Sequence, residues 1–184
     1  MAQEIEAKIK VEALEPTAQR LTELGARFSA VQHQHDVYFH DADGLLKKRG
    51  CGLRLREETV NGKSVFILTF KGPRQDSPFK SRPEFQTQVS DSAEMIKILE
   101  GLGYQPVLTV EKKRSLWQMD GCDICLDEVE MLGPFVEIEG PNEESIRRIL
   151  NKLGLQNKLH LSQSYSSMIA HKLQAEMLNR KSQG

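Results

Sequence analysis

The sequence has little of several features that would narrow its function quickly. Only three of its 184 residues are cysteine, Cys51, Cys122 and Cys125, and so small and odd a number predicts no disulfide framework. No apolar run approaches the roughly 18 residues that a membrane-spanning helix needs, and charged residues near the first position argue against a signal peptide. We therefore expect a reduced, cytoplasmic setting and no membrane partner.

An excess of charge of one sign is also missing. The chain has 25 Lys or Arg and 26 Asp or Glu, so its net charge is −1 although 28% of its residues are charged. A protein that binds nucleic acid through its overall field has a clear basic excess, so we expect no nucleic-acid partner. A hydrophobic fraction of 39% excludes a disordered chain. The length predicts one domain over residues 1–174, followed by a helix end or tail at 175–184.

Stretches in which polar and apolar residues alternate run through most of the chain, as is typical of β-strands. Asn61-Gly62 and Asp120-Gly121 predict tight hairpin turns. Three patches with helical spacing each end in Leu-Gly, a common helix stop. A faint repeat, which aligns Glu6 with Glu84, suggests two similar halves around one centre. The predicted strands lie near 4–11, 31–39, 52–59, 63–71, 82–89, 107–118, 122–129 and 134–139, and the predicted helices at 16–25, 91–102, 142–153 and 164–179.

Charged residues recur at every second position of the predicted strands. Arg54 and Arg56 alternate with leucines, and Lys112 and Arg114 are two positions apart, so each pair would lie on one face of its strand. They could form the solvent-exposed face of an ordinary antiparallel sheet packed on helices. If the sheet closes, they would instead line an interior too polar for a core, namely a water-filled tunnel for a charged ligand. The residues concerned are seven cations, Lys8, Arg54, Arg56, Lys71, Arg82, Lys112 and Arg114, and six acids, Glu4, Glu6, Glu84, Asp127, Glu137 and Glu139.

Both signs of charge together indicate a metal–triphosphate site. Lysine and arginine match phosphate oxygens, and clustered carboxylates suit Mg²⁺ or Mn²⁺, which prefer oxygen ligands. In such a site the metal joins carboxylates to phosphate oxygens, and the cations neutralise the charge that remains.

Several motifs follow one another in a specific order from residue 4 to about residue 170. As an ordered set they resemble the CYTH proteins, also called triphosphate tunnel metalloenzymes, and most of all their class IV adenylyl cyclase (CyaB-like) branch. The motifs are Glu4-Ile5-Glu6-Ala7-Lys8, His35-Asp36-Val37-Tyr38-Phe39, Leu53-Arg54-Leu55-Arg56, Leu68-Thr69-Phe70-Lys71-Gly72-Pro73, Ser81-Arg82-Pro83-Glu84, Val110-Glu111-Lys112-Lys113-Arg114, Leu132-Gly133-Pro134-Phe135-Val136-Glu137-Ile138-Glu139 and Ser164-Tyr165.

The resemblance implies an α+β fold in which eight antiparallel strands close into a tunnel with helices packed outside, often in a homodimer. It implies that Glu4, Glu6 and Glu137, with Glu139 as a fourth, bind Mg²⁺ or Mn²⁺. Gln86 stands where many members have a glutamate, which makes a second metal less certain. The resemblance further implies catalytic roles for Glu4, Glu6, Lys8, Asp36, Tyr38 and Lys112, and substrate binding by Lys8, Arg54, Arg56, Lys71, Arg82, Glu84, Lys112, Arg114 and Asp127.

Three functions are compatible with these residues. An adenylyl cyclase would convert ATP to cyclic AMP and pyrophosphate, and the branch resemblance favours it. A triphosphate hydrolase would use the same tunnel for tripolyphosphate, thiamine triphosphate or a nucleotide. A non-catalytic module that binds polyphosphate gains nothing from acids aimed at its ligand, so it is the least favoured.

Three other signals are interpreted as structural. Cys122 and Cys125 would point to opposite faces of a strand, so they do not form half of a zinc site. His33 and His35 share a face, but no third metal ligand is in view. The basic run at 47–49 is interpreted as a solvated loop that could flank the tunnel entrance and steer anions.

Overall fold

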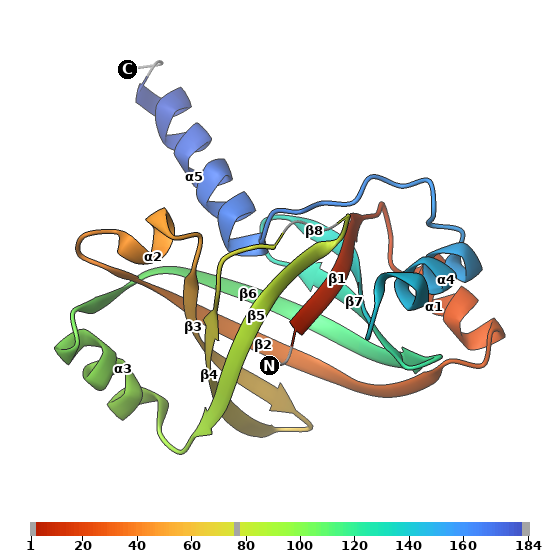
Figure 1. Ribbon diagram of the computed structural model, residues 1–184, viewed down its shortest axis with the longest axis horizontal. Coiled ribbons are helices and arrows are strands. Elements are labelled where there is room, and N and C mark those ends of the chain that lie inside the picture. The colour runs from red at the N-terminus through yellow and green to blue at the C-terminus, as the bar shows by residue number, and fades with distance from the viewer. Residues whose placement is uncertain (1–2, 76–77, 182–184) are drawn as a thin grey trace.

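The computed structural model describes residues 3–75 and 78–181 and is an antiparallel sheet closed on itself (Figure 1). Around the ring the strands follow the order β1-β5-β4-β3-β2-β6-β7-β8. The predicted α+β class and all eight predicted strands are confirmed. The strands are β1 (Gln3–Lys10), β2 (Arg27–Asp41), β3 (Gly52–Val60), β4 (Lys63–Lys71), β5 (Lys80–Val89), β6 (Tyr104–Met119), β7 (Cys122–Val129) and β8 (Gly133–Glu139).

Four of the helices in the described residues match predicted ones. They are α1 (Glu15–Glu23), α3 (Ser92–Gly101), α4 (Glu143–Leu153) and α5 (Tyr165–Lys181). Asp91 and Asn142 cap α3 and α4, because their side chains accept hydrogen bonds from the backbone N–H groups of Glu94 and Ser145. The unpredicted helix α2 (Leu45–Lys48) is only four residues long and therefore too short to show a periodicity. No helix in the described ranges is long and apolar enough to cross a membrane.

Strands β2 and β6 are longer than predicted because they pair with each other along almost their whole length. Their far ends are fixed by packing between side chains, since Phe28 and Trp117 sit directly opposite and meet edge to face at 5.1 Å. This contact joins two segments that are distant in the sequence, so the sequence of either segment alone does not predict where its strand ends.

The ring consists of two similar halves, as the internal repeat suggests. Strand β1 pairs with β5 and β2 pairs with β6, so equivalent strands are neighbours. Glu4 lies directly opposite Arg82, and Gln34 lies opposite Lys112, and each pair is separated by 78 positions in the chain. The two halves are therefore related by an approximate twofold axis that crosses the ring at these two pairs.

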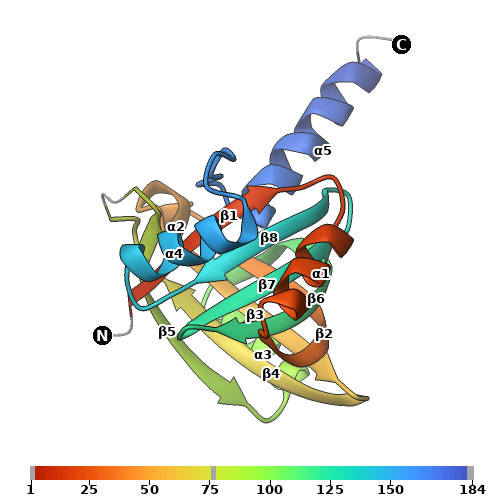
Figure 2. The same cartoon turned by 90° about the vertical axis from the view of Figure 1, so that its right-hand side faces the viewer.

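The apolar faces of the strands point outward, where helices cover them (Figure 2). Helices α1 and α4 cover β1, β7 and β8 in one core that includes Leu21, Ile138 and Ile149. Helix α3 covers a second core through Leu99, which packs near Leu55. Because both of these cores lie outside the ring, its interior is left to polar side chains and to one apolar cluster at the start of α5.

Helix α5 belongs to neither outer core. Its first turns insert Tyr165 and Ile169 against Val110, Val129 and Phe135. Its later turns project away from the ring (Figures 1 and 2). The start of α5 thus closes part of the interior, and its remainder stands beside the opening.

Candidate functional site

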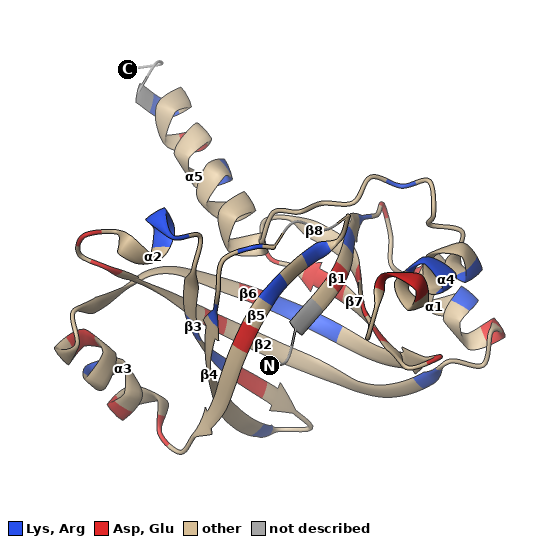
Figure 3. Cartoon of the chain, viewed as in Figure 1, with Lys and Arg blue, Asp and Glu red and all other residues tan. Residues whose placement is uncertain are grey.

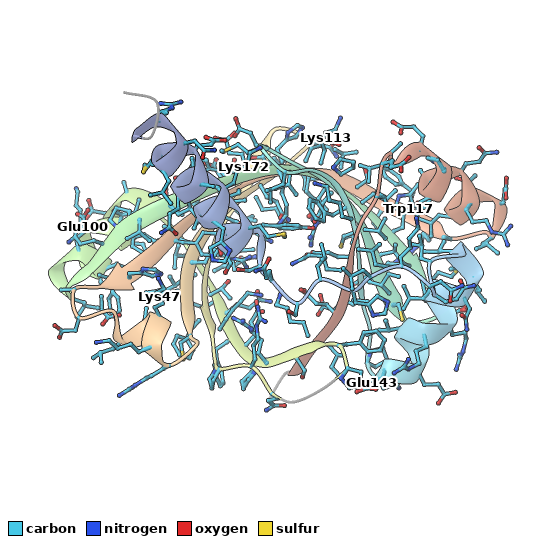
Figure 4. The ribbon with its side chains drawn as sticks, turned by 90° about the horizontal axis from the view of Figure 1, so that it is seen from above. Lys47, Glu100, Lys113, Trp117, Glu143 and Lys172 are labelled. Atoms are coloured by element: carbon cyan, nitrogen blue, oxygen red, sulfur yellow. The ribbon has the colours of Figure 1, made fainter. Side chains whose placement is uncertain are left out.

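The ring encloses a large cavity with a volume of about 1050 Å³. Seen from above, side chains point into the ring, and α5, marked by Lys172, lies across it from α4, marked by Glu143 (Figure 4). The cavity walls are formed by β1, β2, β3, β4, β5, β6 and β8 together with residues of α2 and α5.

The regularly placed cations face this cavity. Arg54, Arg56, Arg82 and Lys112 line it and are each only 8% exposed, whereas Lys113, of the opposite parity, is exposed on the outside. Along β5, basic positions come first and an acidic position follows them (Figure 3). The closed sheet therefore makes these charges an interior lining and excludes the alternative of an ordinary solvent-exposed face.

Asp36 organises the cations of β3 from behind. Arg56, directly opposite it, donates two hydrogen bonds to the carboxylate, at 2.6 and 2.7 Å. Arg54 lies 3.6 Å from the same carboxylate and Lys112 lies 4.0 Å from it. Burial alone would raise the pKa of Asp36, but the arginines hold it well below its usual value. Asp36 does not line the cavity among the described residues, so it orients cations and does not itself face a ligand.

Asp127 plays the same part on the other side of the ring. Arg114, opposite it, donates hydrogen bonds at 2.7 and 2.6 Å, and the Tyr165 hydroxyl donates to it at 2.9 Å. Arg114 also pairs with Glu137. Burial would lower the pKa of Arg114, but Asp127 and Glu137 raise it well above the usual value. Asp127 is fully buried and is not among the described residues that line the cavity. Arg114 is therefore the member of this pair that faces the cavity.

Glu6 and Glu137 converge on one positive centre. The Nζ of Lys8 lies 3.5 Å from a carboxylate oxygen of Glu6 and 3.1 Å from one of Glu137, and Lys80 also pairs with Glu6. Burial alone would lower the pKa of Lys8, but the Glu137 and Glu6 carboxylates raise it. Burial would raise the pKa of Glu137, but Lys8 and Arg114 hold it well below its usual value. Glu137 is therefore ionised, and the carboxylates of Glu6 and Glu137 both lie close to the ammonium group of Lys8.

This pair of acids fits a hard divalent ion. Mg²⁺ takes oxygen ligands and is commonly held by one or two carboxylates together with substrate phosphates. Among the described side chains, no three acidic, histidine or cysteine residues lie close enough to hold an ion by themselves. The side chain of Glu4 is outside the described residues, and Glu139, exposed at the rim, lies opposite Glu6 in the β1–β8 pairing. Phosphate oxygens would have to complete the coordination.

Lys112 is a buried cation whose ion pair with Asp36 is long, at 4.0 Å. It lies 5.2 Å from the centre of the Tyr165 ring, between Arg56 and Arg114. Burial and these two arginines lower the pKa of Lys112 to about 7. The amine is thus ready to gain charge when an anion enters.

The remaining predicted site residues also line the cavity. Lys71 pairs with Glu84 across β4 and β5. Tyr38 stands near the opening, opposite Leu108. Gln86, which replaces a common glutamate, is exposed but still lines the same wall.

Two groups of lining residues were missed from the sequence. Lys80 shares the parity of Arg82 and Glu84, but the predicted strand began at residue 82, which left Lys80 out. The face of α5 that lines the cavity also went unnoticed, because a stripe at helical spacing in a sequence does not distinguish a cavity wall from a core.

The cysteines and histidines that were interpreted as structural agree with the structure. Cys122 packs in the outer core, while Cys125 is buried inside the ring, where burial raises its pKa to about 12. His33 and His35 are exposed. The basic run is not the predicted loop, because Lys47 and Lys48 belong to helix α2, and Lys47 lines the cavity.

Comparison with known proteins gives the chain its family. The CYTH domain profile matches residues 2–165. The protein named "Putative adenylate cyclase MJ0240" from Methanocaldococcus jannaschii is 32% identical over 136 residues, which cover 74% of this chain and 75% of that protein. The protein named "Adenylate cyclase CyaB" from Aeromonas hydrophila is 24% identical over 149 residues, 76% of this chain and 74% of that protein.

Solved structures agree on the fold. The PH1819 protein from Pyrococcus horikoshii OT3 matches with a TM-score of 0.79 at 28% identity, over 92% of this chain and 99% of that one. HpAC1 from Hippeastrum, described as having a dominant triphosphatase activity, matches with a TM-score of 0.67 at 18% identity, over 92% and 95%. The chain belongs to the CYTH domain family and is similar to members that bear adenylate cyclase names.

Proposed function

We propose that this protein is a divalent-metal-dependent enzyme that acts on a triphosphate in the tunnel, and that its reaction is the conversion of ATP to cyclic AMP and pyrophosphate. The observation that carries the proposal is the composition of one cavity, in which buried cations surround a pair of converging acids, Glu6 and Glu137. The name borne by the two relatives supports the choice of a cyclase.

The cations would bind the phosphate chain. Arg54, Arg56 and Arg114 are held in place by Asp36 and Asp127 from behind, so their orientation does not have to be created when a ligand binds. Guanidinium groups match phosphate oxygens with paired hydrogen bonds. Groups oriented in advance stabilise developing charge without reorganisation, which is where most of the rate enhancement would originate.

Glu6 and Glu137 would hold the metal, with Glu4 and Glu139 as proposed further ligands at the same end of the tunnel. A bound Mg²⁺ or Mn²⁺ would supply Lewis-acid charge next to the phosphate oxygens. Lys8, which now neutralises both acids, would be free to turn toward phosphate once they had a cation of their own.

Formation of the cyclic phosphate depends on how the reacting atoms are positioned and requires no covalent intermediate with the protein. The ribose 3′-oxygen forms a bond to the α-phosphorus, the bond from that phosphorus to the oxygen bridging to the β-phosphorus breaks, and the hydroxyl proton passes to water. Pyrophosphate leaves with the electron pair of the broken bond, and the lining cations stabilise its charge. Holding the two reacting atoms together can supply about 7–11 kcal/mol of the barrier.

Hydrolysis of the triphosphate is the second candidate. It would use the same cations and acids with water as the nucleophile, and HpAC1 is described as a dominant triphosphatase on this fold. The two reactions differ in their products. Incubation with Mn²⁺ or Mg²⁺ and ATP, thiamine triphosphate or tripolyphosphate should give cyclic AMP and pyrophosphate from ATP. Orthophosphate as the main product would establish the hydrolase, and no turnover of any substrate would leave only a binding module.

The acids provide a sharper test of the metal site. Glu6→Gln and Glu137→Gln should each lower metal-dependent turnover by about 100-fold or more, since an amide cannot supply the negative charge that a hard ion prefers. Glu128→Gln is the matched control, because Glu128 is exposed on β7 directly beside Asp127. Full metal-dependent activity in Glu6→Gln and in Glu137→Gln would show that these acids are not ligands.

A further inference from the structure

The sheet that forms the ring is interrupted between β1 and β5. The pairing of these two strands ends at Glu6, which lies opposite Lys80. Beyond this pair β1 continues along β8, while β5 gives way to the loop that joins it to β4. The connection between α4 and α5 passes the end of β1 (Figure 1), and there the Leu161 N–H donates to the carbonyl of Lys8 at 2.8 Å. The wall of the ring therefore has a gap at the level of Lys8.

A second cavity, with a volume of about 210 Å³, occupies this gap. We call it the side slot, and on its outer side it is bounded by Phe79, His160 and Ser162. On its inner side the side slot and the tunnel are lined by the same four charged side chains. These side chains form a partition between the two spaces, and they are Glu6, Lys8, Arg74 and Lys80.

His160 is held in the outer wall of the side slot. Its ring stacks on the ring of Phe79 with 5.2 Å between the centroids, and the guanidinium of Arg147 lies 5.0 Å from the centre of the same Phe79 ring. The Nε2 atom of His160 is buried and has no hydrogen-bond partner among the described residues. Buried polar atoms almost always have a partner. This nitrogen therefore indicates that a ligand belongs in the side slot.

The charge around the side slot favours an anion. Among the described lining residues, Lys8, Arg74 and Lys80 supply three positive charges against the one negative charge of Glu6. Burial and the neighbouring charge of Arg82 lower the pKa of Arg74, whereas Glu6 raises it. An anion beside Arg74 would offset the repulsion between the two guanidinium groups. Arginine matches phosphate oxygens in particular, so a phosphate is the anion that fits best.

The size of the side slot excludes the whole substrate. Its volume of about 210 Å³ is below the roughly 300–1,000 Å³ typical of sites for drug-sized organic ligands, whereas the tunnel cavity has about 1050 Å³. A nucleotide therefore fits the tunnel, and only a small anion such as pyrophosphate or orthophosphate fits the side slot. The proposed reaction releases such an anion among the cations of the tunnel.

We propose that the side slot is a second anion site, which binds the inorganic phosphate product and lets it leave while a nucleotide still occupies the tunnel. The inference rests on the proposed function for the identity of the anion, which is pyrophosphate for a cyclase and orthophosphate for a hydrolase. Arg74 pairs with the anion, and the Nε2 of His160 donates a hydrogen bond to it. Lys8 and Lys80 lie between the two spaces, so their charge screens the anion from the phosphates in the tunnel.

Binding in the presence of ATP tests the site without turnover. Wild type is saturated with ATP in excess EDTA, where no metal-dependent reaction occurs, and is then titrated with pyrophosphate by calorimetry. One pyrophosphate should bind per chain. His160→Phe keeps an aromatic ring on Phe79 but loses the nitrogen, so it should weaken pyrophosphate binding about three- to tenfold, as expected for one hydrogen bond. Ser162→Trp fills the side slot from an exposed position and should abolish pyrophosphate binding. Both variants should keep their ATP affinity within about twofold.

A matched variant and a local probe keep this test specific. Lys158 is exposed in the same connection and is not among the described residues that line the side slot or the tunnel. Lys158→Gln should therefore leave both affinities unchanged within about twofold. With ¹⁵N-labelled histidine, pyrophosphate should shift the ring nitrogen resonances of His160, which His160→Phe identifies. The resonances of His33, exposed on the outside of the ring, should not move.

Inhibition kinetics test the exit itself. With Mg²⁺, added pyrophosphate should inhibit wild type in a mixed pattern against ATP, because it reaches the side slot while ATP occupies the tunnel. In Ser162→Trp the product has to leave through the opening beside α5, so the inhibition should become competitive and kcat should fall. Competitive inhibition of wild type would contradict a separate exit.

The outcomes are distinguishable from a failure of the proposed function. If wild type does not bind ATP, the tunnel of the proposed function is wrong, and the shift of the His160 resonances by pyrophosphate alone still decides on the side slot. If ATP binds but excludes pyrophosphate, the two spaces are one site and the inference is overturned. Equal pyrophosphate affinity in wild type, His160→Phe and Ser162→Trp would place the anion elsewhere and overturn it as well.

Discussion

Asp36→Asn should destabilise the protein more than almost any other single polar substitution. The carboxylate is 1% exposed and receives two hydrogen bonds from Arg56, while Arg54 and Lys112 lie within 3.6 and 4.0 Å. Asparagine keeps the size of the side chain but removes the charge. Its amide nitrogen would also face a guanidinium N–H, so one hydrogen bond would become a contact between two donors.

The magnitude follows from the burial of this cluster. Removing one partner of a buried ion pair typically costs about 3–5 kcal/mol, because the other charge stays buried without compensation. In urea, with an m-value of about 2 kcal/mol per molar, the unfolding midpoint should fall by about 1.5–2.5 M. Glu111→Gln is the control, since that acid is 60% exposed and lies 3.9 Å from His35 on the outside of the same strand pair. It should change stability by about 0.5 kcal/mol or less.

At acidic pH, the difference in the free energy of unfolding between wild type and Asp36→Asn should become smaller. The pKa of Asp36 is held below its ordinary value of 3.8, so its stabilisation is complete above that pH. As the pH falls further, through the lower pKa of the folded state, the carboxylate gains a proton and the stabilisation is lost. Urea unfolding at pH 7 and at pH 3 measures both effects. A midpoint for Asp36→Asn within about 0.3 M of Glu111→Gln at pH 7 would refute the reasoning.

Two further predictions follow from Lys112 and Gly140. Because the pKa of Lys112 is lowered to about 7, an entering triphosphate should raise it and take up a fraction of a proton near pH 7, so that affinity falls as pH rises above 7. Calorimetry in buffers of different ionisation enthalpy measures the uptake, and Lys112→Met should remove it; unchanged uptake in Lys112→Met would assign it elsewhere. A Cβ at Gly140 would lie 2.9 Å from the Cys122 sulfur and 3.0 Å from Ile146, so Gly140→Ala should cost about 1–3 kcal/mol through overpacking. Gly101→Ala in α3 meets nothing within 4 Å and should stabilise by at most about 1 kcal/mol; equal urea midpoints for the two variants would contradict this.

Much of the fold could be predicted because strand alternation is a local property of the sequence. Parity alone places Arg54 and Arg56 on one face and Leu53 and Leu55 on the other, and the structure keeps that division. Parity does not say whether the sheet is open or closed. That choice depends on which strands pair, and the pairing of β1 with β5 and β8 involves residues far apart in the chain.

The residues that belong to the site could be predicted from the sequence better than their arrangement in space. The strand pattern includes Asp127 among the acids, and the family resemblance adds Asp36, but the strand register decides that each lies opposite an arginine and behind it. Cross-strand register is set by the whole ring, so no local pattern shows it. The face of α5 that lines the cavity is harder still to predict, because Leu173 and Met177 have the spacing of core residues and differ from them only in what they face.

The most direct measurement of the central claim is a crystal structure with Mn²⁺ and tripolyphosphate, located by the anomalous signal of manganese. The account predicts a manganese peak in contact with the Glu6 and Glu137 carboxylates, and phosphates that contact Arg54, Arg56 and Arg114 inside the ring. Manganese bound away from both acids, or tripolyphosphate bound outside the ring at the basic run of α2, would contradict it.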